Sequence, residues 1–399
     1  MTGRCLAVLL PFVSLGCSTA PHPRLPEKSA TVIPVGPFPA MDATGHRTQI
    51  QQCLDKAGDR PAVFRFAPGD YVLTDAEGLR IPARASLLMD GARFLLAEDI
   101  QTDGQAFLIE NASDVSLHGG EIVGSRAAWA DSTNVAGVRA RGNVQNIRVS
   151  NLTCRDLSSN AVGIFGLGDD APIRNVSLTG VVGINCCNVY VDYLQPNAGP
   201  APGSDRRDQG VVALYHVDGW SVDGCRFEGS RSDGTHFYHC RNGLFTNCSV
   251  TGSQMGGYFI EGCENVLALG NLISDNGSRG VTIERDSRCC TLASCLVTRS
   301  GREGLWMPDV CSIIVTGNIF VENGQKDDGE RDCEIRLDNT DRYATETRDI
   351  RIEGNIFRTA AHQTAVVHMG TGVTGVVMGN NTFEGPAPRC HLASNADQP

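Results

Sequence analysis

The stretch that decides the fold is residues 233–309, where four segments align on a glycine: Asp233-Gly-Thr-His-Phe-Tyr-His239, Gly256-Gly-Tyr-Phe-Ile-Glu-Gly262, Arg279-Gly-Val-Thr-Ile-Glu-Arg285 and Glu303-Gly-Leu-Trp-Met-Pro-Asp309. The aligned glycines (Gly234, Gly257, Gly280 and Gly304) are 23, 23 and 24 residues apart. A fixed period of this length is typical of proteins built from stacked repeats. The sequence therefore predicts a solenoid with coils of about 23 residues.

A second column of small or polar residues recurs with the same period: Cys225, Cys248, Asn271, Cys295, Asn318, Asn355 and Asn381. Asparagines stacked at an inward turn can hydrogen-bond to the backbone and to one another from coil to coil. Cysteine can replace asparagine there as a small buried residue. Single apolar residues between such frequent turns favour short parallel strands, so we predict an all-β parallel β-helix.

Composition narrows the functional class. The chain has 399 residues, 45 glycines and 41% hydrophobic residues, and the apolar residues come in short runs. After residue 20 no run approaches the roughly 18 apolar residues of a membrane-spanning helix. The net charge of -11 and the isoelectric point of about 5.3 disfavour a nucleic-acid partner, which attracts basic proteins.

The first 17 residues have the pattern of a secretory signal peptide, with Arg4 before an apolar run that ends at Gly16. Gly16-Cys17-Ser18 is similar to a bacterial lipoprotein cleavage site, which predicts lipidation of Cys17. We expect an exported protein, either periplasmic, anchored to the outer membrane through that lipid, or extracellular. Ordinary secretion without lipidation is the alternative.

The domain boundaries follow from composition. Residues 18–41 are rich in proline and predict an extended tether. We expect the solenoid to span residues 42–390 and residues 391–399 to form a polar tail. Helical spacing of apolar residues within Thr44–Gly58 predicts a helix covering the first coil. Residues 195–209 and 324–347 interrupt the period and are expected to leave the solenoid as loops beside a groove.

The sixteen cysteines leave two interpretations open. Export favours disulfides, and Cys240 and Cys263 lie one coil apart, within bonding range. Stacked free thiols are the preferred interpretation, because several cysteines occupy repeat positions. The sequence contains no recognisable metal-binding motif and predicts no metal and no cofactor.

The chemistry is expected on the outer face of one strand column. Apart from Thr235, the first and third residues after each glycine are apolar. These positions should point inward, so the second and fourth point outward. Together with the bend that follows, this predicts one exposed patch over four coils, formed by His236, Tyr238, His239, Phe259, Glu261, Glu284, Arg285, Trp306 and Asp309. His216 and His368 are expected to be structural, and Arg139 and Arg141 could extend the groove.

Glu261 and Glu284 suggest a reaction. One of two stacked carboxylates should hold a proton, as the acid and the nucleophile or base of a glycosidase do. Trp306 and Phe259 could stack on a sugar ring, while His236 and Tyr238 could transfer protons. The competing interpretation is an ordinary surface ion pair between Arg285 and Glu284.

From Asp42 to Gly385 the chain resembles the pectate-lyase-like superfamily of right-handed β-helices. The repeat and the opening Phe66-Ala-Pro-Gly-Asp-Tyr71 carry this resemblance. It implies action on a polysaccharide in a groove along the parallel strands, as in lyases, polygalacturonase-type hydrolases, epimerases and phage tailspikes. The catalytic signatures of polygalacturonases and alginate epimerases are absent, and no acidic cluster clearly indicates the calcium site of a pectate lyase, so the resemblance indicates fold rather than reaction.

Three functions remain, in this order. The first is a glycoside hydrolase that uses Glu261 and Glu284. The second is a polysaccharide lyase in which Tyr238, His236 or His239 removes a proton and Arg285 neutralises a uronate. The third is a non-catalytic protein that binds glycans or forms part of the cell envelope.

Overall fold

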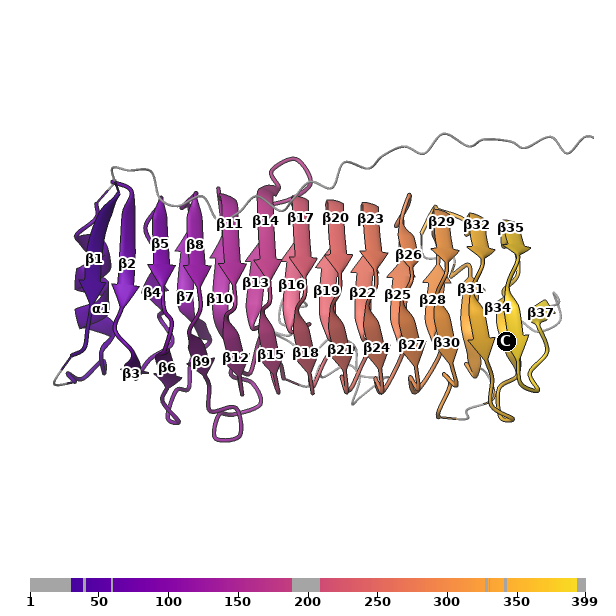
Figure 1. The fold of residues 1–399 in the computed structure, drawn as a ribbon, viewed down its shortest axis with the longest axis horizontal. Coiled ribbons are helices and arrows are strands. Elements are labelled where there is room, and N and C mark those ends of the chain that lie inside the picture. The colour runs from indigo at the N-terminus through magenta and orange to yellow at the C-terminus, as the bar shows by residue number, and fades with distance from the viewer. Residues whose placement is uncertain are drawn as a thin grey trace, which may run out of the picture.

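The computed structural model describes residues 30–38, 41–58, 60–188, 209–326, 329, 331–340 and 343–392. Its strands form three long parallel sheets that wind along one axis (Figure 1). Each coil contributes one strand to each sheet, and equivalent strands of successive coils pair in register.

We name each sheet after its first strand in the chain. The β1 sheet contains β1 (Thr31–Val35), β2 (Ala62–Phe66), β5 (Ala85–Leu88), β8 (Val115–His118), β11 (Gln145–Ser150), β14 (Ile173–Thr179), β17 (Val217–Asp223), β20 (Arg241–Thr246), β23 (Glu264–Leu269), β26 (Thr291–Ala293), β29 (Cys311–Thr316), β32 (Arg348–Glu353) and β35 (Thr374–Gly379). The β3 sheet contains β3 (Gly69–Leu73), β6 (Ala92–Leu96), β9 (Glu121–Val123), β12 (Thr153–Arg155), β15 (Val182–Ile184), β18 (Arg226–Glu228), β21 (Ser249–Thr251), β24 (Leu272–Ser274), β27 (Leu296–Thr298), β30 (Ile319–Val321), β33 (Ile356–Arg358) and β36 (Thr382–Glu384).

The β4 sheet carries the predicted patch. It contains β4 (Leu79–Arg80), β7 (Gly104–Glu110), β10 (Val135–Arg141), β13 (Val162–Phe165), β16 (Val212–Tyr215), β19 (Thr235–Tyr238), β22 (Tyr258–Glu261), β25 (Val281–Glu284), β28 (Leu305–Pro308), β31 (Cys333–Asp338), β34 (Ala365–Met369) and β37 (Cys390–Leu392). The core runs through the middle of the coils, where Phe237, Ile260, Ile283 and Met307 stack from coil to coil. The predicted inward and outward alternation is therefore confirmed.

The solenoid begins earlier than predicted. β1 lies inside the segment 18–41 that was expected to be a tether, and it pairs in parallel with β2. Ile33 and Val35 are buried in the core. The proline-rich composition of this segment predicted a tether instead of a strand. Pro34 is tolerated because β1 is an edge strand of its sheet, where a missing N–H costs little.

Other boundaries also differ. The C-terminal strand β37 includes His391 and Leu392, which were assigned to the tail. β31 lies within the predicted insertion 324–347, so part of that segment belongs to a coil. The signal peptide, Cys17, residues 195–208 of the first insertion and residues 393–399 lie outside the described residues.

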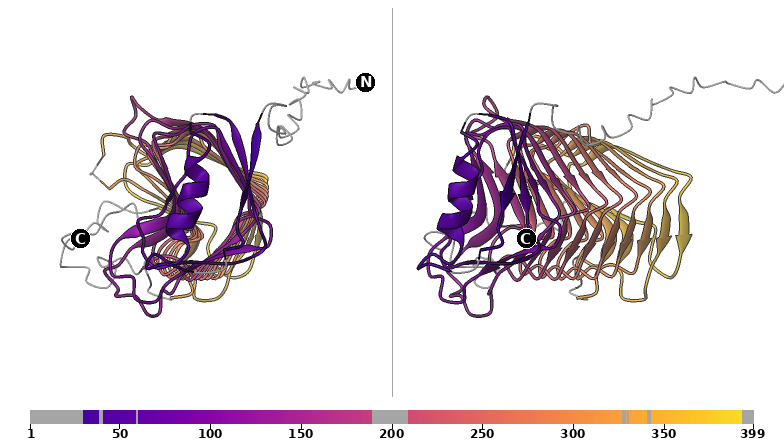
Figure 2. Two further views of the ribbon diagram at one scale, coloured as in Figure 1. Left: turned by 90° about the vertical axis from the view of Figure 1, so that its left-hand side faces the viewer. Right: turned by 60° about the vertical axis from the view of Figure 1, so that its left-hand side comes forward.

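Helix α1 (Arg47–Asp55) buries Ile50, Cys53 and Leu54. Figure 2 shows it across the N-terminal end of the solenoid. Its function as a cap remains a prediction. In the part of the chain that the structure describes, no helix has the length and hydrophobicity needed to span a bilayer.

The predicted asparagine and cysteine ladder is confirmed. The backbone N–H of Cys248 donates to Asn271 Oδ1 at 2.9 Å, and that of Cys295 donates to Asn318 Oδ1 at 2.9 Å. Asn318 Nδ2 donates to Asn355 Oδ1 at 3.0 Å. The cysteines within the described ranges are free thiols, which agrees with the preferred interpretation.

Candidate functional site

The strand register places the predicted residues in two adjacent columns on the outer face of the β4 sheet. Tyr238 of β19 pairs with Glu261 of β22, and Glu261 pairs with Glu284 of β25. Thr282 of β25 pairs with Trp306 of β28. The sequence period fixes this register, because each coil places its fourth residue after the glycine at the same point of the sheet.

The predicted exposure of this patch is wrong for four residues. His236, Glu261, Glu284 and Asp309 are at most 3% exposed. Tyr238, His239, Phe259, Arg285 and Trp306 are half-buried. The physical reason is the close spacing of coils, which brings large outward side chains into contact. The rings of His236 and Phe259, for example, have centroids 4.6 Å apart.

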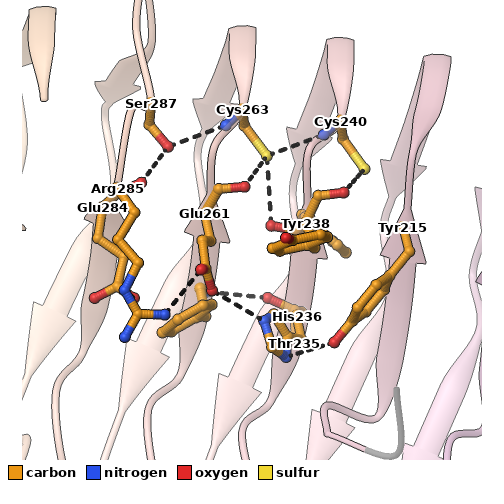
Figure 3. Close-up of polar contacts among 12 residues, drawn as sticks. Tyr215, Thr235, His236, Tyr238, Cys240, Glu261, Cys263, Glu284, Arg285 and Ser287 are labelled. Atoms are coloured by element: carbon orange, nitrogen blue, oxygen red, sulfur yellow. Dashed lines mark hydrogen bonds and ion pairs between the residues drawn. The ribbon is translucent and has the colours of Figure 1, made fainter. Parts of the chain in front are cut away.

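A single guanidinium binds both glutamates. Arg285 Nη1 lies 2.8 Å from Glu261 Oε1, and Arg285 Nε lies 2.9 Å from Glu284 Oε1. Figure 3 shows Arg285 beside the two carboxylates. Burial alone would lower the pKa of Arg285, but the charges of Glu284 and Glu261 raise it. A cation at this distance favours the ionised form of a carboxylate, so the arrangement opposes the protonated acid that a glycosidase needs.

A second polar chain runs from Glu261 toward the preceding coils. Glu261 Oε2 lies 3.8 Å from His236 Nε2, and His236 Nδ1 lies 3.2 Å from the Tyr215 hydroxyl (Figure 3). A proton on Nε2 would face the carboxylate and leave Nδ1 to accept from the phenol. The chain can thus move a proton away from Tyr215.

Sequence reasoning missed Tyr215, although the period could have found it. Tyr215 pairs with Tyr238, and their ring centroids are 5.2 Å apart. The four aligned segments begin at Asp233, so the coil that contains Tyr215 was not part of the alignment. Counting 23 residues back from Tyr238 would have placed Tyr215 in the column.

The Trp306 ring is less available for stacking on a sugar than predicted. The Arg279 guanidinium lies 3.7 Å from the ring centroid and covers one face. The indole Nε1 donates to Asp338 Oδ2 at 2.7 Å, and Arg336 Nε contacts the same oxygen at 2.6 Å. Arg279, Arg336 and Asp338 had no distinctive sequence signal, since each is one charge among many.

The Asp309 carboxylate is hydrogen-bonded to Thr340. Its Oδ1 accepts from the Thr340 backbone N–H at 2.8 Å, and its Oδ2 accepts from the Thr340 hydroxyl. Asp309 thus fastens the segment after β31 to the turn after β28. Direct contact between this buried carboxylate and a substrate is not supported.

His239 contacts an aspartate from an earlier coil. Its Nδ1 lies 3.1 Å from Asp169 Oδ2, and His216 Nδ1 lies 2.7 Å from Asp169 Oδ1. The ligand atoms of these three residues lie within 4.8 Å of one another and could hold a metal ion. His216 and His239 follow Asp169 by 47 and 70 residues, so no sequence motif indicated the cluster.

A family model described as "Right handed beta helix region" matches residues 210–329. The chain is a right-handed parallel β-helix protein. No curated protein sequence matches it. Solved structures resemble this β-helix protein over most of its length.

Three of these structures illustrate the likeness. PfbA, a surface adhesin of Streptococcus pneumoniae, has a TM-score of 0.67 at 12% identity and covers 91% of this chain and 93% of its own. The A-module of mannuronan C-5 epimerase AlgE4 of Azotobacter vinelandii has a TM-score of 0.57 at 14% identity, covering 90% and 98%. A mutant tailspike protein of E. coli bacteriophage HK620, in complex with a pentasaccharide, has a TM-score of 0.61 at 13% identity, covering 86% and 63%. At such identities the likeness establishes the fold and not the reaction.

Proposed function

We propose that this β-helix protein binds and cleaves a polysaccharide on the outer face of the β4 sheet, between β16 and β28. The observation that carries the proposal is a set of half-buried aromatic side chains in two adjacent columns, Tyr238, Phe259 and Trp306, beside a buried ionisable chain. Aromatic rings offer flat apolar area for sugar rings, and the Tyr238 side chain also carries a hydroxyl group. The similarity to a tailspike solved with a pentasaccharide and to a mannuronan epimerase supports the substrate class.

Proton transfer by Tyr215 or Tyr238 suits the geometry better than hydrolysis by the glutamates. Glu261 Oε2 lies 3.8 Å from His236 Nε2, and His236 Nδ1 lies within hydrogen-bond distance of the Tyr215 hydroxyl. With Nδ1 unprotonated, His236 can take the proton of Tyr215 and leave the phenolate that acts as the base. Tyr238 packs against Tyr215 with its ring tilted by 35°, and it is the more exposed of the two phenols. This arrangement favours a lyase-type reaction, in which a base removes a proton next to a sugar carboxylate. The Arg279 guanidinium lies over Trp306 and places a cation at the same face, where its Nε also pairs with Glu303 Oε2 at 3.3 Å.

Glycan binding without cleavage is the second candidate. The observation that favours it is the burial of His236, Glu261 and Glu284, because catalytic groups must reach the bond that they break. The likeness of the fold to a surface adhesin is consistent with such a function. Hydrolysis through Glu261 and Glu284 would require Arg285 to release one carboxylate.

The test is a screen of the purified chain against neutral and uronate polysaccharides, with ultraviolet absorbance and reducing ends read together. Absorbance from unsaturated products, lost in Tyr215→Phe and Tyr238→Phe and kept in His118→Gln, is the expected result. Reducing ends without absorbance would replace the lyase by a hydrolase. Binding without either product would establish the non-catalytic function. The absence of both binding and products would refute the proposal.

Export is part of the proposal, based on the signal-like residues 1–17 and on Cys17. Mass spectrometry of the mature N-terminus in a bacterial host is the direct test. We expect a diacylglyceryl modification that disappears in Cys17→Ser. Cleavage without a lipid would support ordinary secretion instead.

A further inference from the structure

Three metal-ligating side chains meet at the ends of β16 and β19, apart from the glutamates described above. His216 directly follows β16 and His239 directly follows β19, while Asp169 lies in the connection between β13 and β14. The two imidazole Nδ1 atoms face the two oxygens of the Asp169 carboxylate, at 2.7 Å and 3.1 Å. The ligand atoms lie within 4.8 Å of one another. One ion could therefore contact all three residues.

The coil geometry sets the two histidines side by side. Tyr215 and Tyr238 pair in register, so the residues that follow them occupy the same turn of successive coils. Both histidines have a left-handed backbone, with φ of 51° and 50°. Their ring centroids are 5.4 Å apart. The imidazoles consequently project from the same edge of the β4 sheet.

The next turn in this column fixes the orientation of His239. Gly262 occupies that turn, and a Cβ at this position would lie 2.9 Å from His239 Nε2. The imidazole therefore packs over the glycine backbone, and its Nδ1 faces Asp169. The Tyr238 ring confines both imidazoles, with centroids 4.3 Å from His239 and 5.4 Å from His216.

Asp169 is held in place by backbone contacts. Arg241 Nη2 donates to the Asp169 carbonyl at 2.8 Å. The Ala171 N–H donates to the Gly168 carbonyl at 3.0 Å and closes the loop around the aspartate. The three ligands are thus arranged before an ion arrives.

We propose that Asp169, His216 and His239 bind a divalent transition-metal ion such as Zn²⁺. Two imidazole nitrogens and one carboxylate oxygen suit zinc, cobalt or nickel, whereas calcium and magnesium favour oxygen ligands. Bonds of about 2.0–2.1 Å to a tetrahedral ion place ligand atoms about 3.3 Å apart. The two contacts with Asp169 would lengthen by a few tenths of an ångström, while ligand atoms that now lie up to 4.8 Å apart would move closer together. The side chain of Asp169 is 53% exposed, so solvent can reach the site and can complete the coordination.

The test is a titration of the chelator-treated full chain with Zn²⁺ by calorimetry, together with absorbance spectra in Co²⁺. We expect one site, weakened at least about tenfold in Asp169→Asn and in His239→Gln. The matched control is His391→Gln. His391 of β37 and His368 of β34 form a second histidine pair, with Nδ1 atoms 3.2 Å apart, at the C-terminal end of the same sheet. The zinc affinity of this control should equal that of the wild type.

Two further measurements distinguish the proposed site from a cysteine site and from nonspecific uptake. The Co²⁺ spectrum should lack a thiolate charge-transfer band, because a band would assign the site to cysteine. Saturating Zn²⁺ should raise the Tm of the wild type and of His391→Gln but not of Asp169→Asn. Circular dichroism establishes that each variant is folded. Equal zinc uptake by the wild type and the Asp169→Asn/His239→Gln double variant, or no uptake by the folded wild type, would overturn the proposal, whatever the outcome of the polysaccharide screen.

Discussion

Arg285 of one coil binds Glu261 of the preceding coil, with Nη1 and Oε1 2.8 Å apart. The side chain of Glu261 is 4% exposed and that of Arg285 is 22% exposed. Removing one member of a buried ion pair costs far more than removing one at the surface, because the partner charge stays buried. This contact therefore bears on the stability of the solenoid as well as on the candidate site.

We predict that Arg285→Met lowers the free energy of unfolding by about 3–5 kcal/mol at pH 8. Without the guanidinium, Glu261 and Glu284 become stacked buried carboxylates whose folded-state pKa rises above the unfolded value. Such groups bind protons on folding, so stability should recover as the pH falls toward 5. Urea denaturation at both pH values measures the effect.

The matched control is Arg288→Met, which removes an ion pair with Glu264 at 2.7 Å. The side chain of Arg288 is 51% exposed, so the expected loss is at most about 1 kcal/mol. A loss in Arg285→Met no larger than that of the control would show that the buried arrangement contributes little to stability.

For the proposed lyase-type activity, Tyr215→Phe should lower kcat by roughly 100- to 10,000-fold if this phenol transfers the proton. His236→Gln should have a smaller effect and should also shift the pH profile of kcat/KM. Tyr258→Phe, in a core tyrosine of the same sheet, controls for loss of a hydroxyl. An unchanged kcat in Tyr215→Phe would assign the base to another group.

The sequence predicted most of the fold, because the column from Cys225 to Asn381 and the repeated glycines report the period directly. It failed at β1, where prolines masked the pairing. Within the site, the period also fixed the register of Glu261 and Glu284. The burial of the outward-pointing side chains could not be predicted, because it depends on their neighbours on adjacent coils and on the segment anchored by Asp309. The cluster of Asp169, His216 and His239 depends on a loop conformation that has no repeat.

The asparagine ladder allows a prediction about the core. Asn318 is fully buried, and its Nδ2 also donates to the Leu292 carbonyl at 2.9 Å. Asn318→Leu would leave that carbonyl and the Cys295 N–H without these partners, at a cost of about 2–4 kcal/mol. Asn318→Cys should cost less, since cysteine occupies this column at Cys295. Equal losses in urea denaturation would contradict the ladder as the source of stability.

Glu334 should make the stability of the protein depend on pH near neutrality. It is fully buried, and burial raises its pKa to about 7, against hydrogen bonds from Asn323 and Gln363 that lower it. Because the folded-state pKa is raised, the folded chain holds the proton more tightly than the unfolded chain between about pH 4.5 and 7. This contribution is therefore complete at low pH and is lost as the pH rises through 7, by roughly 3 kcal/mol in total. Glu334→Gln should remove this part of the dependence of the unfolding free energy on pH, measured by urea denaturation between pH 5 and 8. Glu353→Gln, at a more exposed carboxylate paired with Arg351, should keep the slope. A wild-type slope that survives in Glu334→Gln would place the titrating group elsewhere.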